Sequence, residues 1–160
     1  MPNDADKQIR LAIKPLITSS YATAQVYPWN VLSHDLSEWP GLFRTTDFST
    51  SGKTHGWIIK RAETSSEWKT FAAKRDRQKW NYDLLGFYGF RNGLEGNNSD
   101  DEFGEILDKV YENLRLSPNL GLAGIVERHD TLQFLRITTI NCGEETLHFA
   151  HGRLPVQLCC

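Results

Sequence analysis

The sequence has no basic excess, few cysteines and no long apolar run, and each of these absences argues against a class of protein. Eighteen Lys and Arg against twenty Asp and Glu give a net charge of −2, whereas proteins that grip DNA by its phosphates usually carry a clear basic excess. Three cysteines are an odd number, which disfavours a disulfide framework. The densest apolar run, Trp57–Ile59, is far too short to span a bilayer. With no basic-then-apolar leader at the start, we expect a soluble protein that folds in a cytoplasm.

Sequence signatures of catalysis, metal binding and nucleotide binding are also missing. Residues 51–54 (Ser-Gly-Lys-Thr) match the end of a P-loop, but Asp47 stands where its first glycine is needed, and a strand pattern follows instead of a helix. His148 and His151 are three residues apart, so on a strand they face opposite sides of the sheet. The cysteines lack the paired short spacings of structural zinc. We therefore expect no enzyme, no cofactor and no metal site.

What is present indicates one α+β domain over residues 1–160, with an N-terminal helix within residues 1–20 and a main helix over 99–116. Pro15 should bend or end the first helix early. Ser99 and Glu102 form a capping-box pattern at the start of the main helix, and Ser117-Pro118 ends it. Its apolar residues recur at helical spacing and predict one buried stripe: Phe103, Ile106, Leu107, Val110 and Leu114.

The remaining segments predict about six strands. Residues 21–40 indicate an irregular connection, and strands over 42–48 and 55–61 flank a turn-rich hairpin. Residues 77–90 alternate as a strand with one buried face. Three further strands, 121–127, 132–140 and 146–158, are joined by short turns, with a loose tail over 155–160. Such short connections predict a largely antiparallel, possibly mixed sheet packed against the main helix.

Charge is unevenly distributed along the chain. Residues 60–79 carry seven basic and three acidic residues, and residues 95–112 carry seven acidic residues and one lysine. A chain with one basic and one acidic face is suited to head-to-tail contacts, which close into a ring when the rotation allows. The candidate residues for a subunit interface or a ring lumen are the basic set Lys74, Arg75, Arg77 and Lys79 and the acidic helix stripe Asp101, Glu105, Asp108 and Glu112.

The order of these elements resembles that of the tail terminator (tail completion) proteins of long-tailed bacteriophages. The resemblance covers residues 5–158 and includes the strand Lys79-Trp80-Asn81-Tyr82-Asp83-Leu84-Leu85-Gly86, the acidic helix and the closing sheet with Asn141-Cys142-Gly143 and Leu147-His148-Phe149-Ala150. It implies a structural virion protein, assembled in the host cytoplasm, that forms a ring, usually a hexamer, at the head-proximal end of the tail tube. There it would stop tube polymerisation and join the tail to the head connector, while DNA passes through the lumen unread.

Two roles for the acidic stripe stay open: it lines the lumen and repels phosphates, or it meets the basic residues 74–79 of a neighbouring subunit. An alternative function is a small nucleic-acid-binding protein that uses residues 74–79 with Trp80, Tyr82 and Phe87. Residues 86–90 partly match the aromatic strand of an RNA-recognition motif, although core packing explains them better. A hydrolase with a His/Asp site assembled by folding is a third hypothesis.

Overall fold

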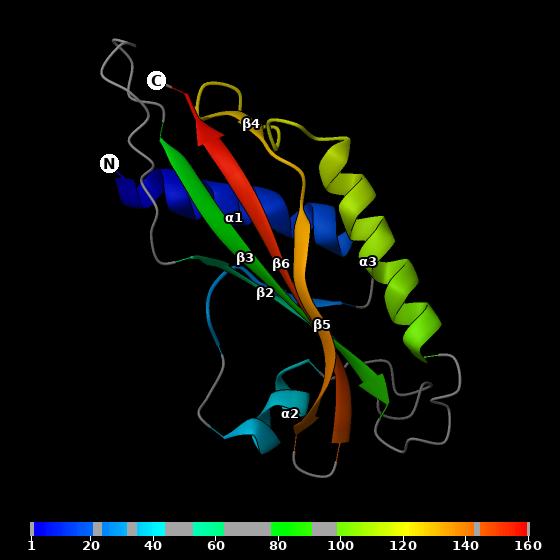
Figure 1. Ribbon diagram of the computed structural model, residues 1–160. Coiled ribbons are helices and arrows are strands. Elements are labelled where there is room, and N and C mark those ends of the chain that lie inside the picture. Colours follow the sequence, from blue (N-terminus) through cyan, green and yellow to red (C-terminus); the bar gives the residue numbers. More distant parts are fainter. Residues whose placement is uncertain are drawn as a thin grey trace.

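A six-stranded sheet, covered on one face by two long helices, organises the computed structural model of the chain (Figure 1). The structure describes residues 2–20, 24–31, 35–43, 53–62, 78–90, 99–142 and 145–159. The helices and strands are α1 (Pro2–Thr18), β1 (Gln25–Tyr27), a 3-10 turn (Leu36–Glu38), α2 (Trp39–Phe43), β2 (Lys53–Arg61), β3 (Lys79–Phe90), α3 (Ser99–Arg115), β4 (Val126–His129), β5 (Gln133–Cys142) and β6 (Glu145–Leu158). The α+β prediction is confirmed.

The strands run in the order β1-β2-β3-β6, and β5 and β4 share the far edge of β6. All pairings are antiparallel except that of β1 with β2. The sheet is therefore mixed. The predicted hairpin between the last two strands is confirmed, because β5 and β6 pair from Cys142 and Glu145 outward. β4 does not pair with β5 but continues along the end of β6.

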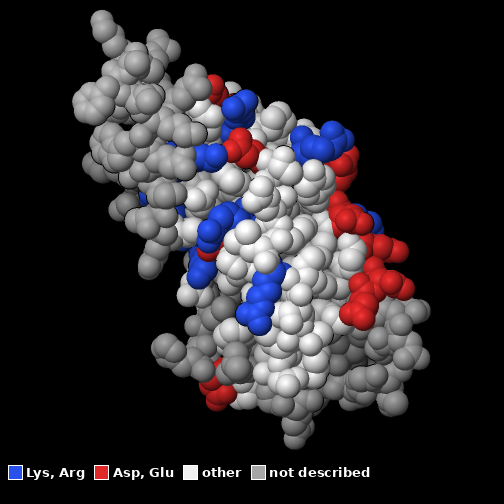
Figure 2. All heavy atoms as spheres, in the orientation of Figure 1, with Lys and Arg blue, Asp and Glu red and all other residues white. Residues whose placement is uncertain are grey.

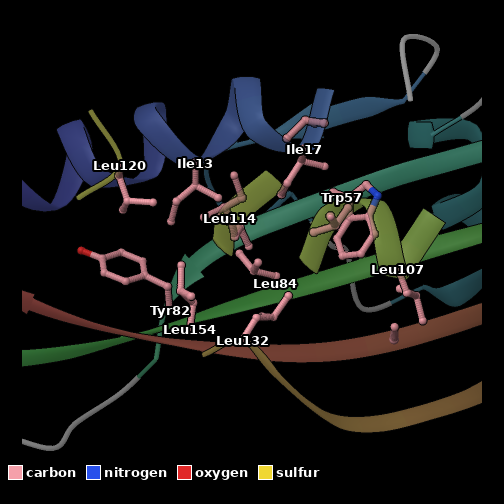
Figure 3. Close-up of a cluster of buried hydrophobic side chains, with 14 of the residues drawn as sticks. Ile13, Ile17, Trp57, Tyr82, Leu84, Leu107, Leu114, Leu120, Leu132 and Leu154 are labelled. Atoms are coloured by element: carbon pink, nitrogen blue, oxygen red, sulfur yellow. The ribbon is translucent and has the colours of Figure 1, made fainter. Parts of the chain in front are cut away.

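Helices α1 and α3 bury their apolar stripes on one face of the sheet (Figure 3). Ile9, Ile13 and Ile17 of α1 are at most 1% exposed. The five apolar residues predicted for the α3 stripe are all buried as well. They pack on the sheet around Trp57 and Leu84. The N-terminal helix is thus an equal part of the core, not an accessory to the main helix.

The opposite face of the sheet is covered at one end only. There the short helix α2 contributes Phe43, which stacks on Phe87 of β3 with ring centroids 4.9 Å apart. Trp39 meets the same Phe87 edge-on. A side chain at Gly56 would collide with the Phe43 ring, so glycine allows α2 to approach the sheet closely. Farther along this face, polar and charged side chains take the place of the apolar cover.

Several predicted elements are wrong in detail. Helix α1 continues past Pro15 to Thr18. Proline removes only one backbone donor, the one that would bond to the Leu11 carbonyl, and the burial of Ile13 and Ile17 outweighs that loss. Leu42 and Phe43 belong to α2, not to a strand. The remainder of the proposed 42–48 strand, residues 44–48, lies outside the described residues.

The connection predicted over residues 21–40 contains strand β1, which has only three residues and too little pattern to reveal itself. The predicted loose tail is also wrong, because residues 155–158 lie in β6. There Val156 and Leu158 are buried in the main core. Finally, β3 is buried on both faces from Tyr82 to Gly89, not on one, because α2 covers the second face around Phe87, and His151 and Arg153 cover Asp83.

Candidate functional site

Of the four basic residues predicted for an interface, only Lys79 is described. Lys74, Arg75 and Arg77 lie outside the described residues. The Nζ of Lys79 donates to Oδ2 of Asp130 at 2.5 Å, and both side chains are about two-fifths exposed. This hydrogen bond holds the pKa of Asp130 below its usual range. Lys79 therefore ties the start of β3 to the β4–β5 turn of its own chain.

The predicted acidic stripe on α3 lies on the surface. Asp101, Glu105, Asp108 and Glu112 are all exposed, opposite the buried apolar stripe. Glu112 accepts hydrogen bonds from Arg115 one turn later, with Oε1 at 2.6 Å from Nη2, which lowers the pKa of the glutamate. Within the described part of the chain the other three carboxylates have no ion-pair partner.

The N-terminus of α3 is connected to the sheet through side chains. The hydroxyl of Tyr88 donates to Glu102, so the glutamate of the capping-box pattern bonds to β3. His148 of β6 lies 3.1 Å from Asp100 and stacks on Phe103. The side chain of Ser99 is outside the described residues. These contacts fix the end of α3 from which the acidic stripe begins.

The uncovered part of the sheet carries a cationic surface that no sequence pattern indicated. We call it the basic sheet face and define it by Lys60 of β2, Arg136 of β5, and His151 and Arg153 of β6. Lys60 is in register with Asp83 of β3, Asp83 with Arg153, and Arg153 with Gln133 of β5, so one row crosses four strands. Arg136 and His151 are paired in the next row. Because these residues come from three separate strands, no local run of charge reveals them.

Asp83 is buried beneath this surface and holds two of its side chains in place. It is only 6% exposed, and its Oδ1 accepts a hydrogen bond from Nε of Arg153 at 3.0 Å. Nε2 of His151 lies 3.0 Å from the same oxygen. Burial opposes the charged form of the aspartate, but the contacts with Arg153 and His151 outweigh it and keep its pKa below the usual range. Lys60 and Arg136 have no ion pair among the described residues, and face outward.

Figure 2 views the molecule in the orientation of Figure 1, with α1 behind the strands. Blue groups are spread over the sheet, separated by uncharged surface, whereas the red groups of α3 line the right-hand side. The acidic groups of α3 and the basic groups of the sheet therefore lie on different sides of the molecule.

Strand β5 forms a long edge of the sheet. It pairs only with β6 among the described strands, and a register shift between Phe134 and Arg136 leaves Leu135 as an extra residue. Leu135 and Ile137 are 51% and 59% exposed. An edge strand with exposed apolar side chains is a ready template for pairing with another chain.

Two of the three aromatic residues proposed for nucleic-acid stacking are not available. Tyr82 and Phe87 are fully buried, Tyr82 under α1 and Phe87 under α2. Trp80 is half-buried, and the Arg61 guanidinium lies 3.9 Å above its ring. Phe87 and Tyr88 therefore belong to the core, as the packing interpretation predicted.

The described histidines have structural contacts. His129 places Nε2 2.8 Å from the carbonyl oxygen of Leu114 and Nδ1 2.7 Å from that of Asp130, so it ties β4 to the end of α3. His148 and His151 face opposite sides of the sheet, as their spacing predicted. Within the described ranges no group of three His, Cys, Asp or Glu side chains is arranged to hold a metal ion. His34 lies outside these ranges.

Comparison with known proteins adds no relative: no protein-family model matches the chain, and no curated protein matches its sequence. In the described parts, no helix has both the length and the apolar character needed to cross a membrane. Function is therefore inferred from the order of the elements and from the surfaces described above.

Proposed function

We propose that the protein is a ring-forming structural subunit that caps the head-proximal end of a phage tail tube, stops its polymerisation and joins the tail to the head connector. The order of elements that resembles tail terminator proteins suggests this role. The observation that carries it is the exposed edge of β5 with Leu135 and Ile137, which is suited to contact with a second copy. A hexamer enclosing the passing DNA is the assembly we expect.

The separation of charge supports the same proposal. The acidic stripe of α3 and the basic sheet face lie on different sides of the molecule. A contact between unlike surfaces is heterologous, and a heterologous contact closes into a ring when its rotation is right.

The alternative, binding of nucleic acid, is supported less well. The cations of the basic sheet face could bind phosphates, but two of the three aromatic residues proposed for stacking, Tyr82 and Phe87, are buried. Base stacking supplies much of the affinity for single strands. Salt-sensitive binding of a single-stranded oligonucleotide by an isolated monomer would favour this alternative.

The test is the solution mass of the chain by light scattering over a range of concentrations, with and without tail-tube protein. We expect rings to form as concentration rises or when tube protein is added. Substituting lysine for both edge residues, Leu135→Lys with Ile137→Lys, should prevent assembly because a charged edge opposes strand pairing. Leu11→Lys, at an apolar residue of similar exposure on α1, is the matched control and should assemble normally. A chain that stays monomeric under all these conditions contradicts the proposal.

A further inference from the structure

The basic sheet face needs a partner of opposite charge. Lys60 and Arg136 have no ion pair among the described residues, and Arg153 shares the carboxylate of Asp83 with His151. Three guanidinium or ammonium groups and a histidine thus share this face of the sheet with one buried aspartate. This surplus of positive charge favours an acidic surface as the occupant.

The acidic stripe on α3 is opposite in charge to this surface and similar to it in length. From Asp101 to Glu112 the helix rises roughly 16 Å at ~1.5 Å per residue. From Lys60 on β2 to Arg136 on β5 the cations of the basic sheet face span four strands, and three strand spacings of ~4.8 Å make roughly 14 Å. Three of the four carboxylates on the stripe have no ion pair within the described part of the chain.

One molecule cannot bring its own two surfaces together. The stripe points away from the core on the outer side of α3, and α3 packs on the face of the sheet opposite to the basic sheet face. Only the α3 of a second copy can reach the basic sheet face. Repeating that contact joins the copies head to tail.

We propose that the basic sheet face of one subunit receives the acidic α3 stripe of the next. This proposal rests on the proposed function, since it names the two surfaces that meet in the ring. It assigns the stripe to the subunit interface rather than to the lumen, and it replaces residues 74–79 by Lys60, Arg136 and Arg153 as the receiving surface.

Charge reversal on each surface tests the pairing in the full chain. One variant carries Lys60→Glu and Arg136→Glu, and the other carries Glu105→Lys and Asp108→Lys. Arg153 is left intact because Asp83 depends on it. Each variant alone should associate at least about tenfold more weakly than the unmodified chain, because like charges then face each other. An equimolar mixture should recover assembly, since each unlike pair is restored between the two variants. Circular dichroism confirms that both remain folded.

Lys7→Glu with Lys14→Glu, on the exposed side of α1, makes the same charge change elsewhere and should assemble like the unmodified chain. If the unmodified chain assembles and both interface variants assemble equally well, the pairing is wrong while the proposed function stands. The pairing is equally wrong if the mixture of folded variants fails to recover. If Lys60→Glu with Arg136→Glu instead abolishes binding of a single-stranded oligonucleotide and leaves assembly intact, the face binds nucleic acid. A chain that never assembles overturns both proposals.

Discussion

Asp83 of β3 and Arg153 of β6 are joined across the sheet by a 3.0 Å hydrogen bond, and the carboxylate is almost inaccessible to water. A buried aspartate is stable only while its charge is compensated. The pair therefore combines two tasks: it completes the packing between the two central strands, and it fixes the guanidinium in the middle of the basic sheet face.

Lowering the pH should weaken the Asp83–Arg153 pair and so lower the stability of the fold. Because the pKa of Asp83 is lower in the folded chain than in the unfolded chain, its stabilisation is fully present above about pH 4, the ordinary aspartate range, and is lost as the pH falls through the folded pKa. Among the described residues, Lys60, His151 and Arg153 are the charged or titratable groups around it. Asp83→Asn should lower the free energy of unfolding by about 1–3 kcal/mol at pH 7 and should flatten this acid dependence. Urea unfolding at several pH values measures both. An Asp83→Asn chain whose acid dependence matches that of the unmodified chain contradicts the assignment.

Gly86 should not accept a side chain. A Cβ there would lie 2.7 Å from the Trp57 ring, which is fully buried against it. Gly86→Ala should cost about 1–3 kcal/mol through overpacking. Gly104 of α3 is the matched control, because a Cβ there meets nothing within 4 Å, and Gly104→Ala should stabilise the helix by about 0.5–1 kcal/mol. The melting temperatures of the two variants should therefore shift in opposite directions, and a Gly86→Ala chain at least as stable as the unmodified chain would be evidence against the close glycine–tryptophan contact.

Asn113 should act as a hydrogen-bond donor between the two long helices. Its Nδ2 is 3.1 Å from the carbonyl oxygen of Leu16 and 2.9 Å from Oγ of Ser20, at the end of α1. Asn113→Ala should cost about 0.5–1.5 kcal/mol. Asn113→Asp should cost more, because a carboxylate cannot donate and its negative charge lies near the C-terminal carbonyls of α1. Chemical denaturation at pH 7 ranks the three chains. If Asn113→Asp is the more stable of the two variants, the donor role is wrong.

Tyr82 should resist ionisation. Its ring is fully buried, and its hydroxyl donates to Oδ1 of Asp6 at 3.0 Å. Burial, and then the charge of Asp6, raise the pKa of the phenol. Its stabilisation of the fold is complete below about pH 10 and is lost as the pH rises toward the folded pKa. The Tyr82 phenolate should therefore form only when the chain unfolds in alkali, which a spectrophotometric titration measures. Tyr82→Phe should leave the titration of the folded chain unchanged and should reduce the phenolate absorbance that appears at alkaline unfolding. If the substitution instead removes a phenolate from the titration of the folded chain, the prediction is wrong.

The sequence predicted those helices and strands that have a clear local residue pattern. The stripe of α3 and the hairpin of β5 and β6 are visible in the order of apolar and turn residues, because helical spacing and short connections leave direct traces in the sequence. Strand β1 left no trace, because three residues paired in parallel with a distant strand have no local signal. The failure at Pro15 has a different cause, since packing of Ile13 and Ile17 outweighs one missing hydrogen bond.

Only one of the two charged surfaces of the candidate site could be predicted from the sequence. The acidic stripe lies on one helix, so its exposure followed from the helical period. The basic sheet face did not follow, because its members belong to β2, β5 and β6, and only the strand register brings them into adjacent rows. The alternation of apolar and polar residues along β3 predicts that Asp83 is exposed. It cannot predict that α2 covers part of the same face, or that charged residues of neighbouring strands surround Asp83.

The position of β6 in the chain has a consequence for biosynthesis. β6 follows all the other described strands, yet it pairs with β3 along ten residue pairs and also holds β4 and β5. Until β6 has been made, β3 has only β2 beside it among the described strands, and neither β4 nor β5 has a partner there. Pairings between such distant segments form slowly. A nascent chain that stops before β6 therefore exposes open strand edges, so proteases and chaperones can distinguish it from a chain that contains β6.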